Sequence, residues 1–208
     1  MDRRSPKRPR SARTLCGKFG LPWHIEFCIT SKDEPHFHLR FAELLLPRVR
    51  RGLRAGFEQL APELLVRRLS PVTFDGGSSA DLIDQFRPDT AFIVIGGNSS
   101  PNRAPGDLKV SWKWQSSMQF SRAAIDQREY KQVLAQVNFY MDQHNARHGY
   151  ILTNTEFVAI KRLDGEGRLA VSMAIPWISG GMGQLSVLLA LWYLGMLAAE
   201  DDNWALIA

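Results

Sequence analysis

Apolar residues in the first part of the chain recur at helical spacing. A helix is predicted to begin near His38, with Pro47 expected to kink or interrupt it, and Glu58–Arg68 is predicted as a second helical segment. Ala80–Phe86 is predicted as a short helix that leads into Arg87-Pro88-Asp89. The apolar positions that define the first helix are Leu39, Ala42, Leu45, Leu46, Val49 and Leu53.

The periodicity then changes to that of strands. Ala91–Ile95 is apolar and β-branched, and Asp107–Trp114 alternates polar and apolar side chains over eight residues, so both are predicted strands. Gly96–Gly106, with three glycines, two prolines and two asparagines, is predicted to be the flexible connection between them. In the second strand, Leu108, Val110, Trp112 and Trp114 are expected to face the core, and Asp107, Lys109, Ser111 and Lys113 to share the opposite face.

The remaining pattern predicts one amphipathic helix, further strands and a buried helix. The order of these elements indicates a mixed α/β or α+β sandwich. The run Leu185–Ala199 is almost wholly apolar, but its 15 residues fall short of the ~20 needed to cross a bilayer, so a core helix is expected and no membrane association. The predicted segments are the helix Asp126–His144, the strands Tyr150–Thr153, Phe157–Leu163 and Leu169–Trp177, and the helix Leu185–Ala199.

Charge is concentrated at the amino terminus. The 208-residue chain has a net charge of +5, and its first 13 residues alone hold six basic and one acidic side chains, which leaves 20 of each in the rest. Residues 1–20 are predicted to be a disordered basic leader, acting as a nuclear localisation signal, a phosphate-binding arm or an idle terminus. Residues 21–208 are predicted to form a single domain. Two cysteines, Cys16 and Cys28, and no visible signal peptide indicate an intracellular location, with the nucleus as one option.

Candidate chemistry lies in the two predicted strands. Asp107 and Lys109 are two residues apart on one strand face, ~6.5 Å along the strand. Asp89 precedes Asp107 by 18 residues, and a hairpin-like pair would bring the two carboxylates together. Clustered carboxylates repel each other unless a cation joins them, and oxygen ligands of this kind suit Mg²⁺ or Mn²⁺. The backbone carbonyl of Leu108 is a further plausible ligand, and Lys109 would stabilise charge at a phosphate.

Pro88-Asp89 followed by Asp107-Leu-Lys109 resembles the motif of the PD-(D/E)XK nuclease superfamily. The order of elements is similar as well, since a helix there precedes the strands that carry the acids and the lysine, and another helix follows. The resemblance implies a restriction-endonuclease-like mixed sheet flanked by helices and metal-dependent cleavage of nucleic acid, with DNA as the expected substrate. Because some members carry a glutamine on the following helix, Gln132 and Gln136 join the candidate catalytic residues Asp89, Asp107 and Lys109.

Two aspects of the resemblance leave choices open. Members often have a glutamate on their first helix, and Glu43, Glu58 and Glu63 are the candidates here. The part of the chain after Lys109 also resembles small uncharacterised fungal proteins of this type. This second resemblance does not imply a substrate. Its resembling segments are Ser111–Trp114, Gln136–Met141, Gly149–Thr153 and Leu191–Leu194.

Other functions remain open from sequence alone. The main alternative is a catalytically inactive module of nuclease-like fold that binds nucleic acid or protein. The arginines of the first helix, Arg48, Arg50, Arg51 and Arg54, could contact phosphate or form a solvated face. Structural zinc on His144 and His148 is a minor alternative, because no Cys-x₂-Cys pair accompanies them. The oligomeric state is open, a homodimer being one option since nucleases that cut both strands are often dimeric.

Overall fold

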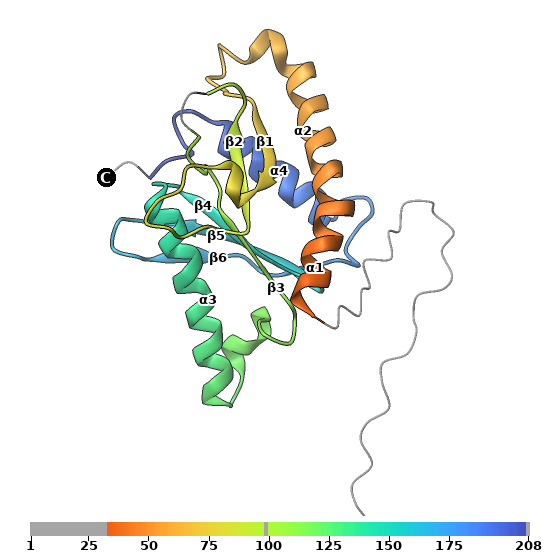
Figure 1. The fold of residues 1–208 in the computed structure, drawn as a ribbon. Helices are drawn as coiled ribbons and strands as arrows, with labels where there is room; N and C mark the ends of the chain where they lie inside the picture. The colour runs from red at the N-terminus through yellow and green to blue at the C-terminus, as the bar shows by residue number, and fades with distance from the viewer. Residues whose placement is uncertain (1–32, 98–99, 207–208) are drawn as a thin grey trace, which may run out of the picture.

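The computed structural model describes residues 33–97 and 100–206. The predicted leader at 1–20 and the two cysteines, Cys16 and Cys28, lie outside these residues. The described chain is a mixed α/β structure in which helices pack on a seven-stranded mixed sheet (Figure 1). Within it, no helix is long and apolar enough to cross a bilayer.

Six strands follow one another across the sheet in chain order. Neighbours are antiparallel except β3 and β4, which are parallel because α3 carries the chain from the end of one to the start of the other. β7 adds to β5 beyond this series. The strands are β1 Val72–Gly76, β2 Thr90–Val94, β3 Gly106–Lys109, β4 His148–Thr153, β5 Glu156–Arg162, β6 Leu169–Val171 and β7 Ile175–Pro176.

The helices divide between the two faces of the sheet, as the positions of α2 and α3 in Figure 1 show. Residues of α1, α2 and α4 pack with Leu108, Val110 and Leu152 in the larger core cluster. Residues of α3 pack with Ile151 and Val158 in a second cluster on the opposite face. The helices are α1 Glu34–Arg40, α2 Leu46–Leu60, α3 Ala124–Gln143 and α4 Val187–Ala199.

The first helix is interrupted, one of the two outcomes expected at Pro47, and the interruption lies just before the proline. Phe41–Leu45 forms a π-helical turn between α1 and α2, and Pro47 lies in the first turn of α2, where a missing N–H is tolerated. α2 ends at Leu60 and a 3₁₀ turn, Ala61–Glu63, follows, so the predicted helix over Glu58–Arg68 is largely wrong. The apolar periodicity was correct in outline, since Leu45, Val49 and Leu53 are all buried.

The predicted strand Asp107–Trp114 is correct only in its first half. β3 ends at Lys109 because its partner β4 ends opposite it at Thr153. The chain then turns, with the N–H groups of Lys113 and Trp114 donating to the Val110 carbonyl at 2.9 and 3.2 Å. Trp112 is therefore 61% exposed rather than in the core, and Trp114 is buried against α3 in the second cluster.

Two other predictions are corrected. Ala80–Phe86 is not a helix, because Asp84 and Gln85 have φ of 50° and 62°, which right-handed helices do not contain. Leu169–Trp177 is not one strand but is divided into β6 and β7. The strand β1 was not predicted. The strands near 91–95, 150–153 and 157–163 and the helices near 126–144 and 185–199 are confirmed, with ends shifted by one or two residues.

Gly106 lets three strands meet closely. A Cβ at this position would lie 2.1 Å from the ring of Tyr150 on β4 and 2.4 Å from the hydroxyl of Thr90 on β2. The two hydroxyl groups also form a buried hydrogen bond with each other. The bare glycine therefore allows Tyr150, which stacks on Phe157 with ring centroids 5.4 Å apart, to reach across β3 to β2.

Substitution Gly106→Ala is expected to destabilise the fold by about 1–3 kcal/mol, because the methyl group forces Tyr150 and Thr90 apart. Urea unfolding followed by circular dichroism measures the change. Gly180→Ala is the matched control, since a Cβ there meets nothing within 4 Å. Equal unfolding midpoints for the two variants would contradict the packing described.

His148 on β4 is a buried, neutral side chain. It is 7% exposed, its Nδ1 has no hydrogen-bond partner, and burial lowers its pKa to about 4, with help from the charges of Lys161 and Arg147. The unfolded chain therefore binds more protons than the folded one between about pH 6.5 and 4. Stability from this group is complete above pH 6.5 and is lost as the pH falls through that window.

Relative to His148→Gln, the wild-type protein is expected to lose about 2–3 kcal/mol of stability between pH 7 and pH 4. The comparison removes the contribution of every other titrating group. His36→Gln serves as the control because His36 is exposed. A difference between wild type and His148→Gln that does not change with pH would exclude a neutral buried histidine.

Candidate functional site

The site forms where β2 separates from β3. The two strands share only the pair Thr90–Gly106, so farther along β3 the backbone has no strand partner on that side. The carboxylate of Asp89, just before β2, takes that place and accepts a hydrogen bond from the N–H of Leu108 at 2.7 Å. The N–H and C=O of one strand residue point to the same side, so the Leu108 carbonyl also faces the Asp89 side.

Pro88-Asp89 is fixed from the other direction by the end of β1. The N–H of Gly77 donates to the carbonyl of Asp89 at 3.0 Å. A Cβ on Gly77 would lie only 1.7 Å from the carbonyl oxygen of Pro88, so no larger residue fits without moving this backbone. Asp89 is therefore placed by backbone contacts on both sides, which makes its position well defined.

Asp107 and Lys109 lie on the face of β3 that α3 covers, and the strand alternation predicted for them is confirmed over Gly106–Lys109. Asp107 is 1% exposed, and its Oδ2 lies 2.7 Å from Lys109 Nζ. The charge of Lys109 is the largest influence that favours the ionised form of this buried carboxylate. Asp89 lies close enough to interact with the same carboxylate.

The charges at this site are strongly coupled. Burial raises the pKa of Asp107 to about 7, the Asp89 carboxylate raises it further, and Lys109 opposes the rise. Burial acts to lower the pKa of Lys109, but Asp107 and then Asp89 outweigh it, so the net shift is upward. Lys109 therefore stays charged and is the one cation among these three side chains. A proton on Asp107 or a bound cation would balance the second acid.

Helix α3 places polar side chains near Asp107 and Lys109. Gln136 Nε2 donates to the Tyr140 hydroxyl at 2.8 Å. Burial raises the pKa of Tyr140, and the charges of Asp107 and Asp89 contribute to the rise, so the phenol is electrostatically coupled to both acids. The sequence pattern put Tyr140 on the core face of its helix, and the residue is indeed only 6% exposed. Gln136 lies four residues before Tyr140 on the same helix. This i, i+4 spacing was the sequence signal that Tyr140 also contacts the glutamine beside the site.

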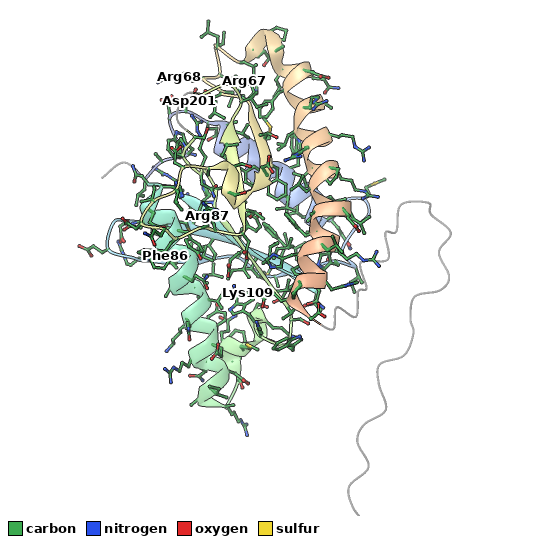
Figure 2. The ribbon with its side chains drawn as sticks, viewed as in Figure 1. Arg67, Arg68, Phe86, Arg87, Lys109 and Asp201 are labelled. Atoms are coloured by element: carbon green, nitrogen blue, oxygen red, sulfur yellow. The ribbon has the colours of Figure 1, made fainter. Side chains whose placement is uncertain are left out.

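Gln132 and Gln136 line a cleft of about 530 Å³ that also reaches Lys109. The structure therefore brings both predicted glutamines to the region of the lysine. Figure 2 shows Lys109 between the amino-terminal end of α1 and the helix α3. Its side chain is 16% exposed, so it is mostly packed while it still lines the cleft.

The acidic residue that α1 places near the lysine is Glu34. Its carboxylate pairs with Lys113 and interacts electrostatically with Lys109. Burial acts to raise the pKa of Glu34, but Lys113 and Lys109 hold it below its ordinary value. The expected helix start at His38 concealed this residue. The start signal was Asp33, which caps the helix by accepting from the His36 N–H at 2.9 Å, followed by a proline in the first turn.

The three glutamates predicted as first-helix candidates are all exposed. Glu63 forms an ion pair with Arg67 at 2.5 Å, at the far end of α2. None of the three is among the side chains that chiefly shift the pKa of Asp107 or of Lys109. Glu34 is instead the acid of the first helix that interacts with Lys109.

The arginines of α2 have different surroundings. Arg48 hydrogen-bonds to the carbonyl of Leu44, while Arg50 bonds to the carbonyl of Phe74 at 2.7 Å and pairs with Asp75. Arg48 and Arg50 therefore stabilise the fold through these contacts. Arg51 and Arg54 are exposed on α2, and a phosphate contact by them stays a prediction.

The two histidines considered for zinc are separately buried. His144 Nδ1 accepts from the N–H of Asn102 at 3.2 Å, and His148 faces the side of the sheet that α4 covers. In the part of the chain that the structure describes, no three His, Cys, Asp or Glu side chains form a group that could hold a metal. A structural zinc site on His144 and His148 is not supported.

Comparisons with known proteins add no assignment to this site. No family model, no curated protein and no solved structure matches the chain. The chemistry of the site has to be inferred from its own residues.

Proposed function

We propose that this protein is a metal-dependent nuclease that hydrolyses phosphodiester bonds in nucleic acid. The observation that carries the proposal is the buried Asp107 carboxylate, with Lys109 Nζ 2.7 Å from its Oδ2 and Asp89 fixed beside it on the Leu108 N–H. Two acids beside one lysine form a place where a bound cation would balance the second carboxylate when both acids are ionised.

The donor set fits Mg²⁺ or Mn²⁺ better than a softer metal. Two carboxylates and the Leu108 carbonyl are all oxygen donors, and the Asp107 carboxylate is buried with Lys109 Nζ 2.7 Å from its Oδ2. Mg²⁺ commonly takes only one or two protein carboxylates and keeps several waters, so a pair of acids suits it although no group of three potential ligands occurs among the described residues. Asp89, Asp107 and Leu108 are the proposed ligands.

Each side chain then has a distinct role. When bound, the cation supplies Lewis-acid charge at the scissile phosphate. Lys109, held by Asp107 and accessible from the cleft, stabilises the negative charge that develops on the phosphate or orients the attacking water. Gln136 holds the Tyr140 hydroxyl at 2.8 Å, and this pair positions polar groups beside the acids. Gln132 lines the same cleft.

The arrangement also supports the resemblance to the PD-(D/E)XK nucleases and a restriction-endonuclease-like fold. α2 precedes the strands β2 and β3 that carry the acids and the lysine, and α3 follows them. This is the order that the resemblance implies. Two carboxylates and a lysine at one end of paired strands are also the side chains that its motif specifies.

Manganese is expected to raise the melting temperature of the wild-type protein. At a metal concentration 100-fold above Kd, the added stability is about 2.7 kcal/mol, or roughly 5–10 °C for a chain of this size. Asp89→Asn and Asp107→Asn should each reduce or abolish the shift, and Glu58→Gln, an exposed acid on α2, should retain it. Equal shifts in all four proteins would rule out the proposed ligands.

Cleavage of labelled single-stranded, duplex and branched DNA in Mg²⁺ or Mn²⁺ tests the activity itself. Lys109→Ala is expected to reduce the rate roughly 100-fold or more, because one charge at the transition state is lost. Lys161→Ala, which removes an exposed lysine from β5, is the control. Equal rates for wild type and Lys109→Ala would refute the assignment of the lysine.

A catalytically inactive binding module is the second candidate. It is favoured by the absence, among the described residues, of a group of three potential metal-binding side chains. DNA binding in the presence of chelator, without a thermal shift by Mn²⁺ and without cleavage, would support this candidate over a nuclease.

A further inference from the structure

The cleft beside Lys109 has walls of different chemical character. It lies between the turn that follows β3 and the first half of α3, and its volume is about 530 Å³. Lys109 and Lys113 are on the turn side, and Gln132 and Gln136 are on the helix side. Pockets for small organic ligands span about 300–1,000 Å³, so a nucleotide unit fits here.

Trp112 is the unusual residue of the cleft. It is 61% exposed, although the sequence pattern assigned it to the core. The Lys113 ammonium lies 5.3 Å from the centroid of its ring and is itself paired with Glu34. The indole is therefore restrained by a cation while most of its surface remains in solvent. An exposed aromatic ring at a polar cleft is a stacking surface for a planar group.

Two acids line the cleft on the α3 side. Asp126 lies in the first turn of α3, where it accepts a hydrogen bond from the Ser121 hydroxyl at 2.6 Å, and Glu129 follows one turn later. Their negative charge repels a phosphate but not an uncharged base. The amide groups of Gln132 and Gln136 can donate to and accept from base edges. An uncharged base is therefore tolerated on the α3 side of the cleft, where a phosphate is repelled.

We propose that this cleft binds an unpaired nucleobase stacked on Trp112, so that the substrate is single-stranded or locally unpaired nucleic acid. A base inside a duplex presents no free face to an indole, and it reaches such a surface only when it leaves the stack. This inference rests on the proposed nuclease function for its biological meaning. The binding itself needs no metal and no cleavage, so it is measured separately.

The test measures binding of fluorescein-labelled oligo(dT) and of a blunt duplex of equal length by anisotropy, in chelator. The wild-type protein is expected to bind oligo(dT) more tightly than duplex. Trp112→Ala should weaken oligo(dT) binding roughly 5- to 150-fold, the range found when one base-stacking aromatic is removed. Trp112→Phe should restore most of it, since a smaller ring still stacks.

Tyr193→Ala is the matched control, because Tyr193 is an exposed aromatic on α4 outside this cleft. Circular dichroism melting establishes that each variant is folded. Equal oligo(dT) affinities for wild type and Trp112→Ala, or equal losses in Trp112→Ala and Tyr193→Ala, would overturn the proposal. Tighter binding of the duplex than of oligo(dT) would also overturn it.

The two proposals fail in different ways. If Trp112→Ala loses oligo(dT) binding while wild type and Lys109→Ala show equal cleavage, the base site stands and the nuclease assignment falls. If cleavage depends on Lys109 but oligo(dT) binding does not depend on Trp112, the nuclease assignment stands and the base site falls.

Discussion

The hydrogen bond from the Leu108 N–H to Asp89 is the interaction on which the candidate site depends. It replaces the strand pairing that β2 would have supplied had it continued beside β3. A buried N–H cannot be left without a partner at small cost, so the backbone itself requires an acceptor there. Because that acceptor is a carboxylate, satisfying the sheet also places a negative charge beside Asp107.

The site is electrostatically incomplete, and this incompleteness distinguishes it from an ordinary surface ion pair. Asp107 is nearly inaccessible to water, its pKa is raised by burial, and among the described residues Lys109 is the cation paired with it beside Asp89. Glu34 and Lys113 neutralise each other nearby and add no net charge. Such an arrangement lowers stability, and proteins retain costly charge arrangements of this kind most often at functional sites.

How much could be predicted from sequence follows from the range of the interactions involved. Local alternation placed Asp107 and Lys109 on one face of a strand, and the glycine-rich connection between 96 and 106 correctly suggested that Asp89 lies nearby. The end of β3 could not be predicted, because it is set by where β4 stops, some 40 residues later, and Trp112 was misplaced for that reason. Glu34 was missed because the helix start was judged from apolar spacing and not from its capping residue. Tyr140 was concealed because it belongs to the buried face of α3 and to the site at once.

The stacking of Trp114 on Tyr130 has a consequence for molecular recognition. The two rings are nearly parallel, with centroids 5.7 Å apart, and Trp114 is fully buried. This contact ties the turn after β3 to α3, which are the two sides of the cleft. The two sides of the cleft are therefore fixed relative to each other before a ligand binds. Binding then carries little entropic cost for ordering the protein. Affinity in such a preorganised cleft is set by the fit of the ligand, so discrimination between similar ligands is expected to be expressed in dissociation rates.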